Sequence, residues 1–321
     1  MTAATVEKPK RLTVHWGRWL PAYGVYVALA ALVLVNAVIT DNFLAWENLR
    51  IQLVQVAPVV IVALGMAVVI GTEGVDLSVG AVMALAAAVV PIYLGYGAVP
   101  AVAMALLGGV VVGLVNGGLI AGVGLQPIVA TLALLVAGRG IALVISDGKL
   151  KEIRNADLVA FGNGELLGLP YSVWLAGALT VLVALLVRKT VFGRQLVAVG
   201  GNRPAAQLAG LPVRRVLIGV YVLSAVLASI AGVLAVARIQ SSDASQVGQL
   251  YELSAITAVV VGGTPLTGGK VRVLGTVAGA LLMQLVVATL IKHDLRSSIA
   301  EMVQAVIIVA AVYAARERGT R

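Results

Sequence analysis

The 321-residue sequence contains no cysteine, only two histidines and few charged residues, and each shortage excludes a class of function. Without cysteine the chain has no disulfides, no iron–sulfur cluster, no covalently attached haem and no cysteine-ligated zinc. The histidines, His15 and His293, lie far apart in the sequence, so no histidine-pair metal motif exists and we expect no metal site. Charged residues make up 12% of the chain, against about 25% in soluble domains, and this shortage argues against a soluble protein.

Motifs for phosphate binding and hydrolysis are also missing. The nearest approach to a phosphate-binding loop ends in Gly269-Lys270, but Val271 stands where a hydroxyl residue is needed and Thr264 where the first glycine belongs. No Gly-x-Ser-x-Gly nucleophile motif occurs. The sequence therefore predicts a protein that is not an enzyme, hydrolyses no ATP itself and holds no cofactor.

Apolar residues dominate what is present, at 60% of the chain with a mean hydropathy of +1.04. This composition predicts an all-α integral membrane protein, with the lipid bilayer as its surroundings. The formal charge of +9 does not indicate a nucleic-acid partner, because basic residues gather in the cytoplasmic loops of membrane proteins and no aromatic-and-basic surface pattern accompanies them.

Apolar runs divide the chain into about ten transmembrane elements. The expected spans are 21–39, 53–70, 79–97, 99–121, 127–146, 171–187, 216–236, the short run 253–261, 273–291 and 298–315. They form one transmembrane domain, 19–315, between an N-terminal segment, 1–18, and a tail, 316–321. In the fourth span, glycines recur at spacings of four between Gly109 and Gly117, which predicts a helix face for close packing.

Charge sets the expected orientation of these spans. The segment 1–18 is basic, and the loop 188–215 carries six basic residues and no acidic one. Six spans separate the two segments, so both lie on one side, which the positive-inside rule makes the cytoplasm. Arginines in the tail 316–321 place it on the same side. We therefore expect a multi-pass protein with both termini in the cytoplasm.

Two polar, glycine-rich stretches, 71–80 and 262–270, interrupt apolar runs. Their motifs, Gly74-x-x-Leu77-Ser78-x-Gly80 and Gly263-x-x-Leu266-Thr267-x-Gly269, match at identical spacing. Irregular backbone at membrane depth persists only where it is packed in protein or lines a cavity. Paired interruptions in two halves of a chain indicate a transporter built from internal repeats.

Polar residues in and near these breaks are candidates for lining a path or supporting the broken helices: Glu73, Asp76, Ser78, Asn116, Arg139, Thr264 and Thr267. Asp76 suits the capping of a helix that begins near Leu77, and a place in the path is the other interpretation. Ser78 and Thr267 are expected to satisfy free backbone amides. Arg139 is expected to pair with Glu73 or Asp76, or to reach the outer face.

Two further carboxylates, Asp243 and Glu252, are expected in a polar external loop. They would lie in a solvated loop or meet an external partner.

A short helix is expected at about 203–209, inside the basic loop. Asn202 is a suitable N-cap, Pro204 suits an early helical position and Gly210 a helix end. The loop either sets topology only or docks a cytoplasmic partner. A short helix that exposes Leu208 to water has little reason to form unless a partner covers it, which favours the docking interpretation.

Three stretches together resemble one family, the monosaccharide ABC-importer permeases of the ribose, xylose and galactofuranose group. The stretch 71–80 resembles Gly-Gly-Ile-Asp-Leu-Ser-Val-Gly, 200–211 resembles Gly-Gly-Asn-x-x-Ala-Ala-x-x-Ser-Gly, and 261–269 resembles Gly-Gly-Thr-Ser-Leu-x-Gly-Gly. Glu73 and Pro265 depart from these patterns. Three other stretches, 126–132, 138–140 and 155–170, look most like the galactofuranose-type member.

The resemblance implies a type II importer fold with broken helices in the cytoplasmic (inner) membrane of a prokaryote. Two permease subunits, as a homodimer or heterodimer, would enclose a path for a pentose or hexose. A cytoplasmic tandem ATP-binding protein would hold ATP and magnesium, and an external sugar-binding protein would deliver the substrate. The loop 188–215 would be the coupling loop.

The coupling residues would be Gly201, Asn202, Arg203, Pro204, Ala205, Ala206, Leu208 and Gly210. The main alternative is a proton-coupled secondary transporter that uses Glu73 and Asp76 as a relay. A passive channel and a membrane scaffold are further alternatives.

Overall fold

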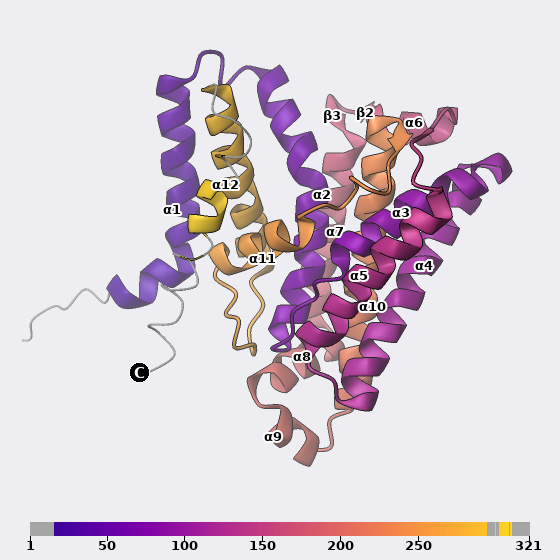
Figure 1. Cartoon of the computed structure of the whole chain (residues 1–321). Coiled ribbons are helices and arrows are strands. Elements are labelled where there is room, and N and C mark those ends of the chain that lie inside the picture. The colour runs from indigo at the N-terminus through magenta and orange to yellow at the C-terminus, as the bar shows by residue number, and fades with distance from the viewer. Residues whose placement is uncertain (1–15, 294–298, 300–301, 308, 310–321) are drawn as a thin grey trace, which may run out of the picture.

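The computed structural model describes residues 16–293, 299, 302–307 and 309. Most of them lie in helices (Figure 1). The helices are α1 (Trp16–Ile39), α2 (Trp46–Gly71), α3 (Val79–Tyr93), α4 (Ala98–Gly118), α5 (Pro127–Ser146), α6 (Ala156–Asn163), α7 (Tyr171–Lys189), α8 (Val191–Gly201), α9 (Arg203–Leu208), α10 (Val213–Ile239), α11 (Tyr251–Val261) and α12 (Val273–Lys292). A 3-10 turn, η1 (Leu94–Tyr96), follows α3, and a π-helical turn, η2 (Leu119–Val123), follows α4. The expected all-α fold is confirmed.

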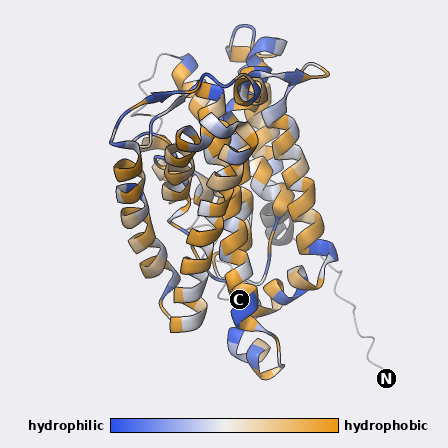
Figure 2. Ribbon diagram, turned by 90° about the vertical axis from the view of Figure 1, so that its right-hand side faces the viewer, coloured by the Kyte–Doolittle hydropathy of each residue, from blue (hydrophilic) through white to orange (hydrophobic). Residues whose placement is uncertain are grey.

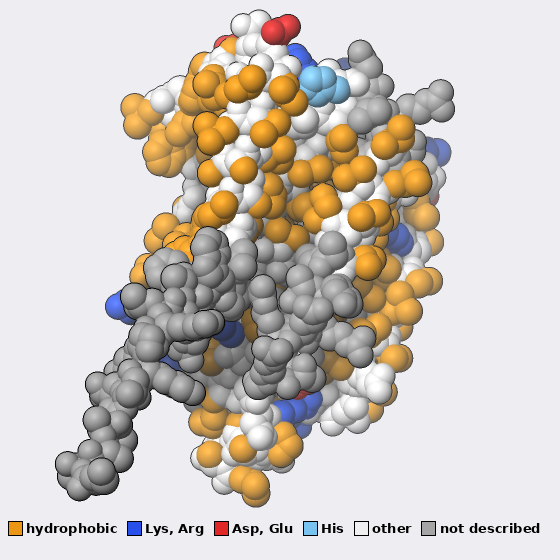
Figure 3. All heavy atoms as spheres, turned by 90° about the vertical axis from the view of Figure 1, so that its left-hand side faces the viewer, with side chains coloured by type: hydrophobic (Ala, Val, Ile, Leu, Met, Phe, Trp, Pro, Cys, Tyr) orange, Lys and Arg blue, Asp and Glu red, His pale blue; other side chains and the backbone are white. Residues whose placement is uncertain are grey.

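Seven helices in the described part of the chain are long and apolar enough to cross a membrane. Two shorter apolar stretches are also present, Tyr23–Ile39 within α1 and Tyr251–Val261, which is α11. They correspond to the expected first and eighth elements. Most of the expected tenth span, 298–315, lies outside the described residues, as do nearly all of 1–18 and the whole of 316–321. Hydrophilic segments lie at the two ends of the bundle and hydrophobic ones between them (Figure 2). Hydrophobic side chains also dominate much of the face in Figure 3. The chain is therefore a multi-pass membrane protein.

Helix α10 lies at the centre of the bundle and packs along α4, α2 and α3. Three glycines of α4 face it. A methyl group added at Gly109 would come within 2.9 Å of Ser229 Cβ, and one at Gly113 within 2.5 Å of Val222 Cα. One at Gly117 would come within 2.7 Å of a third α10 residue. The predicted close-packing face is therefore present, and it contacts α10.

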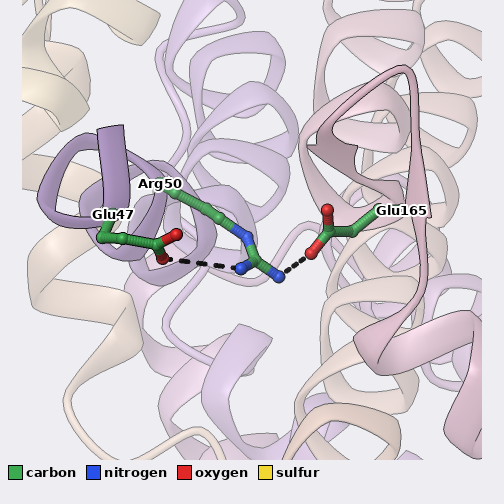
Figure 4. A network of polar contacts seen from close by, with 3 residues as sticks. All are labelled: Glu47, Arg50 and Glu165. Carbon is green, nitrogen blue, oxygen red and sulfur yellow. Dashed lines mark hydrogen bonds and ion pairs between the residues drawn. The ribbon is translucent and has the colours of Figure 1, made fainter. Parts of the chain in front are cut away.

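The polar connections contain more structure than expected. The stretch 147–170 includes α6 and the strands β1 (Lys151–Glu152), β2 (Glu165–Leu166) and β3 (Leu169–Pro170). β1 pairs antiparallel with β4 (Ser241–Ser242), and β2 with β3. Arg50, near the start of α2, lies 3.7 Å from Glu47 and forms an ion pair with Glu165 (Figure 4). These contacts join α2 to the β2–β3 hairpin at the end of the bundle opposite α9.

Candidate functional site

The first break, residues 72–78, joins α2 to α3 and is held in place by a buried carboxylate. Asp76 is completely buried. Its Oδ1 accepts hydrogen bonds from the backbone N of Ser78 at 3.0 Å and from Ser78 Oγ at 2.6 Å. Its Oδ2 accepts one from Ser224 Oγ of α10 at 2.8 Å. The carboxylate therefore holds the turn before α3 and ties it to α10, but it does not cap α3, whose N-cap residue is Ser78.

Other buried polar groups extend this cluster. Asn116 Nδ2, from α4, donates to Ser78 Oγ at 2.8 Å. The hydroxyl of Tyr221 lies 2.6 Å from the position of a methyl group added at Gly74. Asn116 Oδ1 and the Tyr221 hydroxyl are buried and have no hydrogen-bond partner among the described residues. We call Asp76, Ser78, Asn116, Tyr221 and Ser224 the buried polar cluster. Tyr221 and Ser224 were not expected, because they lie in an otherwise apolar span.

Glu73 and Arg139 lie outside this cluster. Glu73 is exposed and has a left-handed backbone, with φ of +64°. Arg139 Nη2 donates to the carbonyl of Gly248 at 2.8 Å. The expected pairing of Arg139 with Glu73 or Asp76 is therefore wrong. The residues before α11 fold back over the start of α3, and this brings a carbonyl within reach of the guanidinium.

Glu252 does not lie in a solvated external loop, as had been expected. It is 8% exposed, in the first turn of α11. A methyl group added at Gly80, in the first turn of α3, would collide with Glu252 Oε2 and with the Gly248 carbonyl. The cause is the same folding back of the chain before α11, which buries Glu252 near Arg139.

The second break, residues 262–272, begins with the same turn as the first. Glu73 N donates to Ile70 O, and Gly74 N donates to Val69 O. The corresponding bonds after α11 run from Gly263 N to Val260 O and from Thr264 N to Val259 O. Gly263 has φ of +84°, so its structural counterpart is Glu73 and not Gly74. At the helix ends the motif alignment is therefore wrong by one residue, because that position is set by left-handed backbone and not by glycine itself. The second break is also longer than the first.

The hydroxyl residues of the breaks have roles that differ from those expected. Thr264 is buried, and its Oγ1 accepts a hydrogen bond from the backbone N of Arg272 at 3.0 Å. Thr267, which was expected to satisfy a backbone amide, is exposed. Ser78 uses its hydroxyl on Asp76 and Asn116 and not on a backbone amide. Of these three hydroxyl groups, therefore, Thr264 is the one that accepts a hydrogen bond from the backbone of a break in the described part of the chain.

Both breaks meet the end of α8 at what we call the glycine junction, formed by Gly71, Gly200, Gly268 and Gly269. Gly269 N donates to Gly71 O at 3.0 Å. A methyl group added at Gly200 would collide with Gly71 O and come within 2.8 Å of Gly269 N. One at Gly268 would come within 2.7 Å of Gly200 O. Since α8 leads directly into α9, the junction links both breaks to that helix.

Helix α9 forms as expected and projects from one end of the bundle (Figure 1). The side chain of Asn202 accepts a hydrogen bond from Ala205 N at 2.9 Å, and Pro204 lies in the first turn. Gly210 follows the helix with φ of +75°. Leu208 is 91% exposed, whereas Ala206 is buried. The expected coupling residues other than Ala206 are all exposed: Gly201, Asn202, Arg203, Pro204, Ala205, Leu208 and Gly210.

Comparison with known proteins identifies the class of this chain. A family model described as "branched-chain amino acid transport system / permease component" matches residues 48–312. The chain belongs to this family of membrane permeases.

Individual relatives are sugar permeases that match the chain almost from end to end. The chain is 39% identical to the galactofuranose transporter permease protein YtfT of Escherichia coli (strain K12), over 94% of this chain and 91% of that protein. It is 38% identical to the ribose import permease protein RbsC of the same strain, over 97% and 98%. It is 36% identical to the fructose import permease protein FruF of Bifidobacterium longum (strain NCC 2705), over 88% and 84%. No solved structure matches the chain. The resemblance to monosaccharide importer permeases is confirmed, and these relatives are transport subunits and not enzymes.

Proposed function

We propose that this chain is the membrane subunit of an ATP-binding-cassette importer that moves a pentose or hexose across the cytoplasmic membrane of a prokaryote. It pairs with a second permease subunit, identical or different, and receives its sugar from an external binding protein. ATP and magnesium are held by a separate cytoplasmic ATPase. Both termini lie on the cytoplasmic side.

The observation that carries this proposal is the projecting helix α9. A short helix gains little stability by itself in water, and α9 exposes nearly the whole of Leu208. Basic residues surround it in the loop 188–215, as is usual on the cytoplasmic side. We assign α9 the role of a coupling helix that inserts into the ATPase. Its movement reaches both breaks through the glycine junction.

The first experiment is copurification. The chain is purified from its native cells, and the ATP-binding protein that copurifies with Leu208→Asp is compared with that for Leu167→Asp. Leu167 is 86% exposed on the β2–β3 hairpin, at the other end of the molecule. We expect Leu208→Asp to release the ATPase and abolish uptake, while Leu167→Asp leaves both unchanged. Retention of the ATPase and of full uptake by Leu208→Asp would contradict the role of α9.

The second experiment is uptake into lipid vesicles that contain the complex. Labelled ribose, arabinose, fructose, galactose and leucine are compared, since the family description names branched-chain amino acids. We expect uptake of a sugar that requires ATP and survives collapse of the proton gradient. Uptake of leucine only would identify an amino acid importer. Uptake that follows the proton gradient without ATP would support the relay through Glu73 and Asp76.

A further inference from the structure

A cleft lined by amide and hydroxyl side chains lies between α1, α2 and α12, at the end of the bundle opposite α9. Its polar lining consists of Asn36, Thr40, Asn48, Gln52, Gln55, Thr289 and the charged Lys292. Gln284 of α12 adjoins it, and its Nε2 donates to Gln52 Oε1 at 3.2 Å and to Gln55 Oε1 at 2.8 Å. We call this feature the amide cleft. It holds about 200 Å³.

The amide cleft contains more hydrogen-bonding capacity than its own residues use. A glutamine side chain offers two N–H donors and one carbonyl acceptor. Among the described residues, the amide nitrogens of Gln52 and Gln55 and the carbonyl of Gln284 have no partner. Gln55 is exposed, although it lies in a helix that is apolar enough to span a membrane. An unpaired amide needs water or a ligand to satisfy its donors and acceptors, so this cleft is open to one or the other.

The chemistry of the lining selects one class of ligand. Neutral amides both donate and accept, as the hydroxyl groups of a sugar do. The lining contains no carboxylate, and its single charged residue, Lys292, is positive, so a neutral ligand is favoured over a cation. Phe43 and Leu285 add apolar wall, which suits the C–H faces of a sugar ring.

We propose that the amide cleft is a monosaccharide subsite at the outer mouth of the path, where Gln52, Gln55 and Gln284 bind ring hydroxyls. This inference rests on the proposed function and adds to it a place where the permease itself contacts the sugar. The rival explanation is that the glutamines only join α2 to α12.

Absence of native cysteine allows a direct test. Ala288→Cys places one thiol in the cleft lining, and Val181→Cys places one on α7, where the side chain is 58% exposed in a span. The full chain in lipid vesicles is treated with a water-soluble thiol reagent. The treatment is repeated with ribose, arabinose, fructose or galactose. We expect Ala288→Cys to react and at least one sugar to slow the reaction, while Val181→Cys does not react.

The glutamines are then tested in the Ala288→Cys background. Gln55→Leu and Gln284→Leu should each weaken protection by about fivefold or more, because each removes hydrogen bonds to the sugar. Thr180→Val is the matched control, because it also removes a polar group from a span. Its hydroxyl bonds only within α7, to Ala176 O at 2.7 Å. Absence of reaction at Ala288→Cys, absence of protection by every sugar, or equal protection in the leucine variants would overturn the subsite.

Uptake separates failure of the subsite from failure of the proposed function. If no sugar protects Ala288→Cys but ATP drives sugar uptake, the proposed function stands and the subsite is refuted. Protection by a sugar without ATP-driven uptake supports the subsite and refutes the importer. In the complex, Gln55→Leu should raise the sugar concentration for half-maximal uptake and leave ATPase copurification unchanged.

Discussion

The guanidinium of Arg238, in the last turn of α10, donates a hydrogen bond of 3.2 Å to the carbonyl of Val54 in α2. Val54 lies four residues before Pro58, which has no N–H to offer that carbonyl. Arg238 therefore replaces the helix hydrogen bond that proline removes. It joins two central helices at the point where α2 lacks a bond of its own.

This relationship predicts a dependence between two substitutions. Arg238→Met should lower the free energy of unfolding by about 1–3 kcal/mol, because the Val54 carbonyl loses its partner. In a Pro58→Ala background the restored N–H can pair with that carbonyl, so the same substitution should cost less than half as much. Unfolding of the four proteins in detergent measures the coupling. Equal costs in both backgrounds would show that Arg238 does not serve the carbonyl.

The backbone at Glu73 predicts that glycine is more stable there. A side chain in the left-handed region costs about 1–2 kcal/mol, so Glu73→Gly should raise the melting temperature. Gly263→Ala, at the corresponding position with φ of +84°, should lower it. Thermal unfolding in detergent tests both. A lower melting temperature for Glu73→Gly would mean that the carboxylate makes a stabilising contact that outweighs the strain.

The glycine junction predicts opposite outcomes for adjacent glycines. Gly200→Ala places a methyl group against Gly71 O and should destabilise by about 1–3 kcal/mol and reduce ATP-driven uptake. Gly201→Ala meets Gly269 Cα at 4.0 Å, which is ordinary contact, and should keep the melting temperature of the wild type. Expression, melting temperature and uptake are compared for the two variants. Normal uptake by Gly200→Ala would show that the glycine junction does not transmit the movement of α9.

The buried polar cluster predicts that a single hydroxyl on α10, that of Ser224, contributes to the free energy of unfolding. Ser224→Ala leaves Asp76 Oδ2 without its donor and should cost about 1–3 kcal/mol, as expected when a buried acceptor loses its partner. Ser245→Ala removes a similar bond, to Asp243, at an exposed position, and should cost less than about 0.5 kcal/mol. Unfolding in detergent compares the two. Similar costs would argue against a supporting role for Asp76.

Local signals in the sequence were sufficient to predict some of the candidate site. Helix α9 could be predicted because Asn202, Pro204 and Gly210 each act on backbone within a few residues. The glycines of α4 predicted a close-packing face, although not its partner. Asp76 was identified by its charge between two apolar runs.

Contacts between distant residues could not be predicted in this way. Arg139 and Gly248 are separated by more than a hundred residues, and only the folded chain brings them together. Glu252 was expected to be exposed because polar residues surround it, but the chain before α11 folds inward. The repeat was aligned on glycine letters, whereas the backbone places Glu73 in the conformation of Gly263.

The bond between Gly269 and Gly71 has a consequence for how such permeases diversify. It joins peptide groups only, so no side chain that meets cargo is needed for it. If α9 couples to an ATPase as proposed, residues that contact the solute can be exchanged while this backbone connection to the ATPase keeps its geometry.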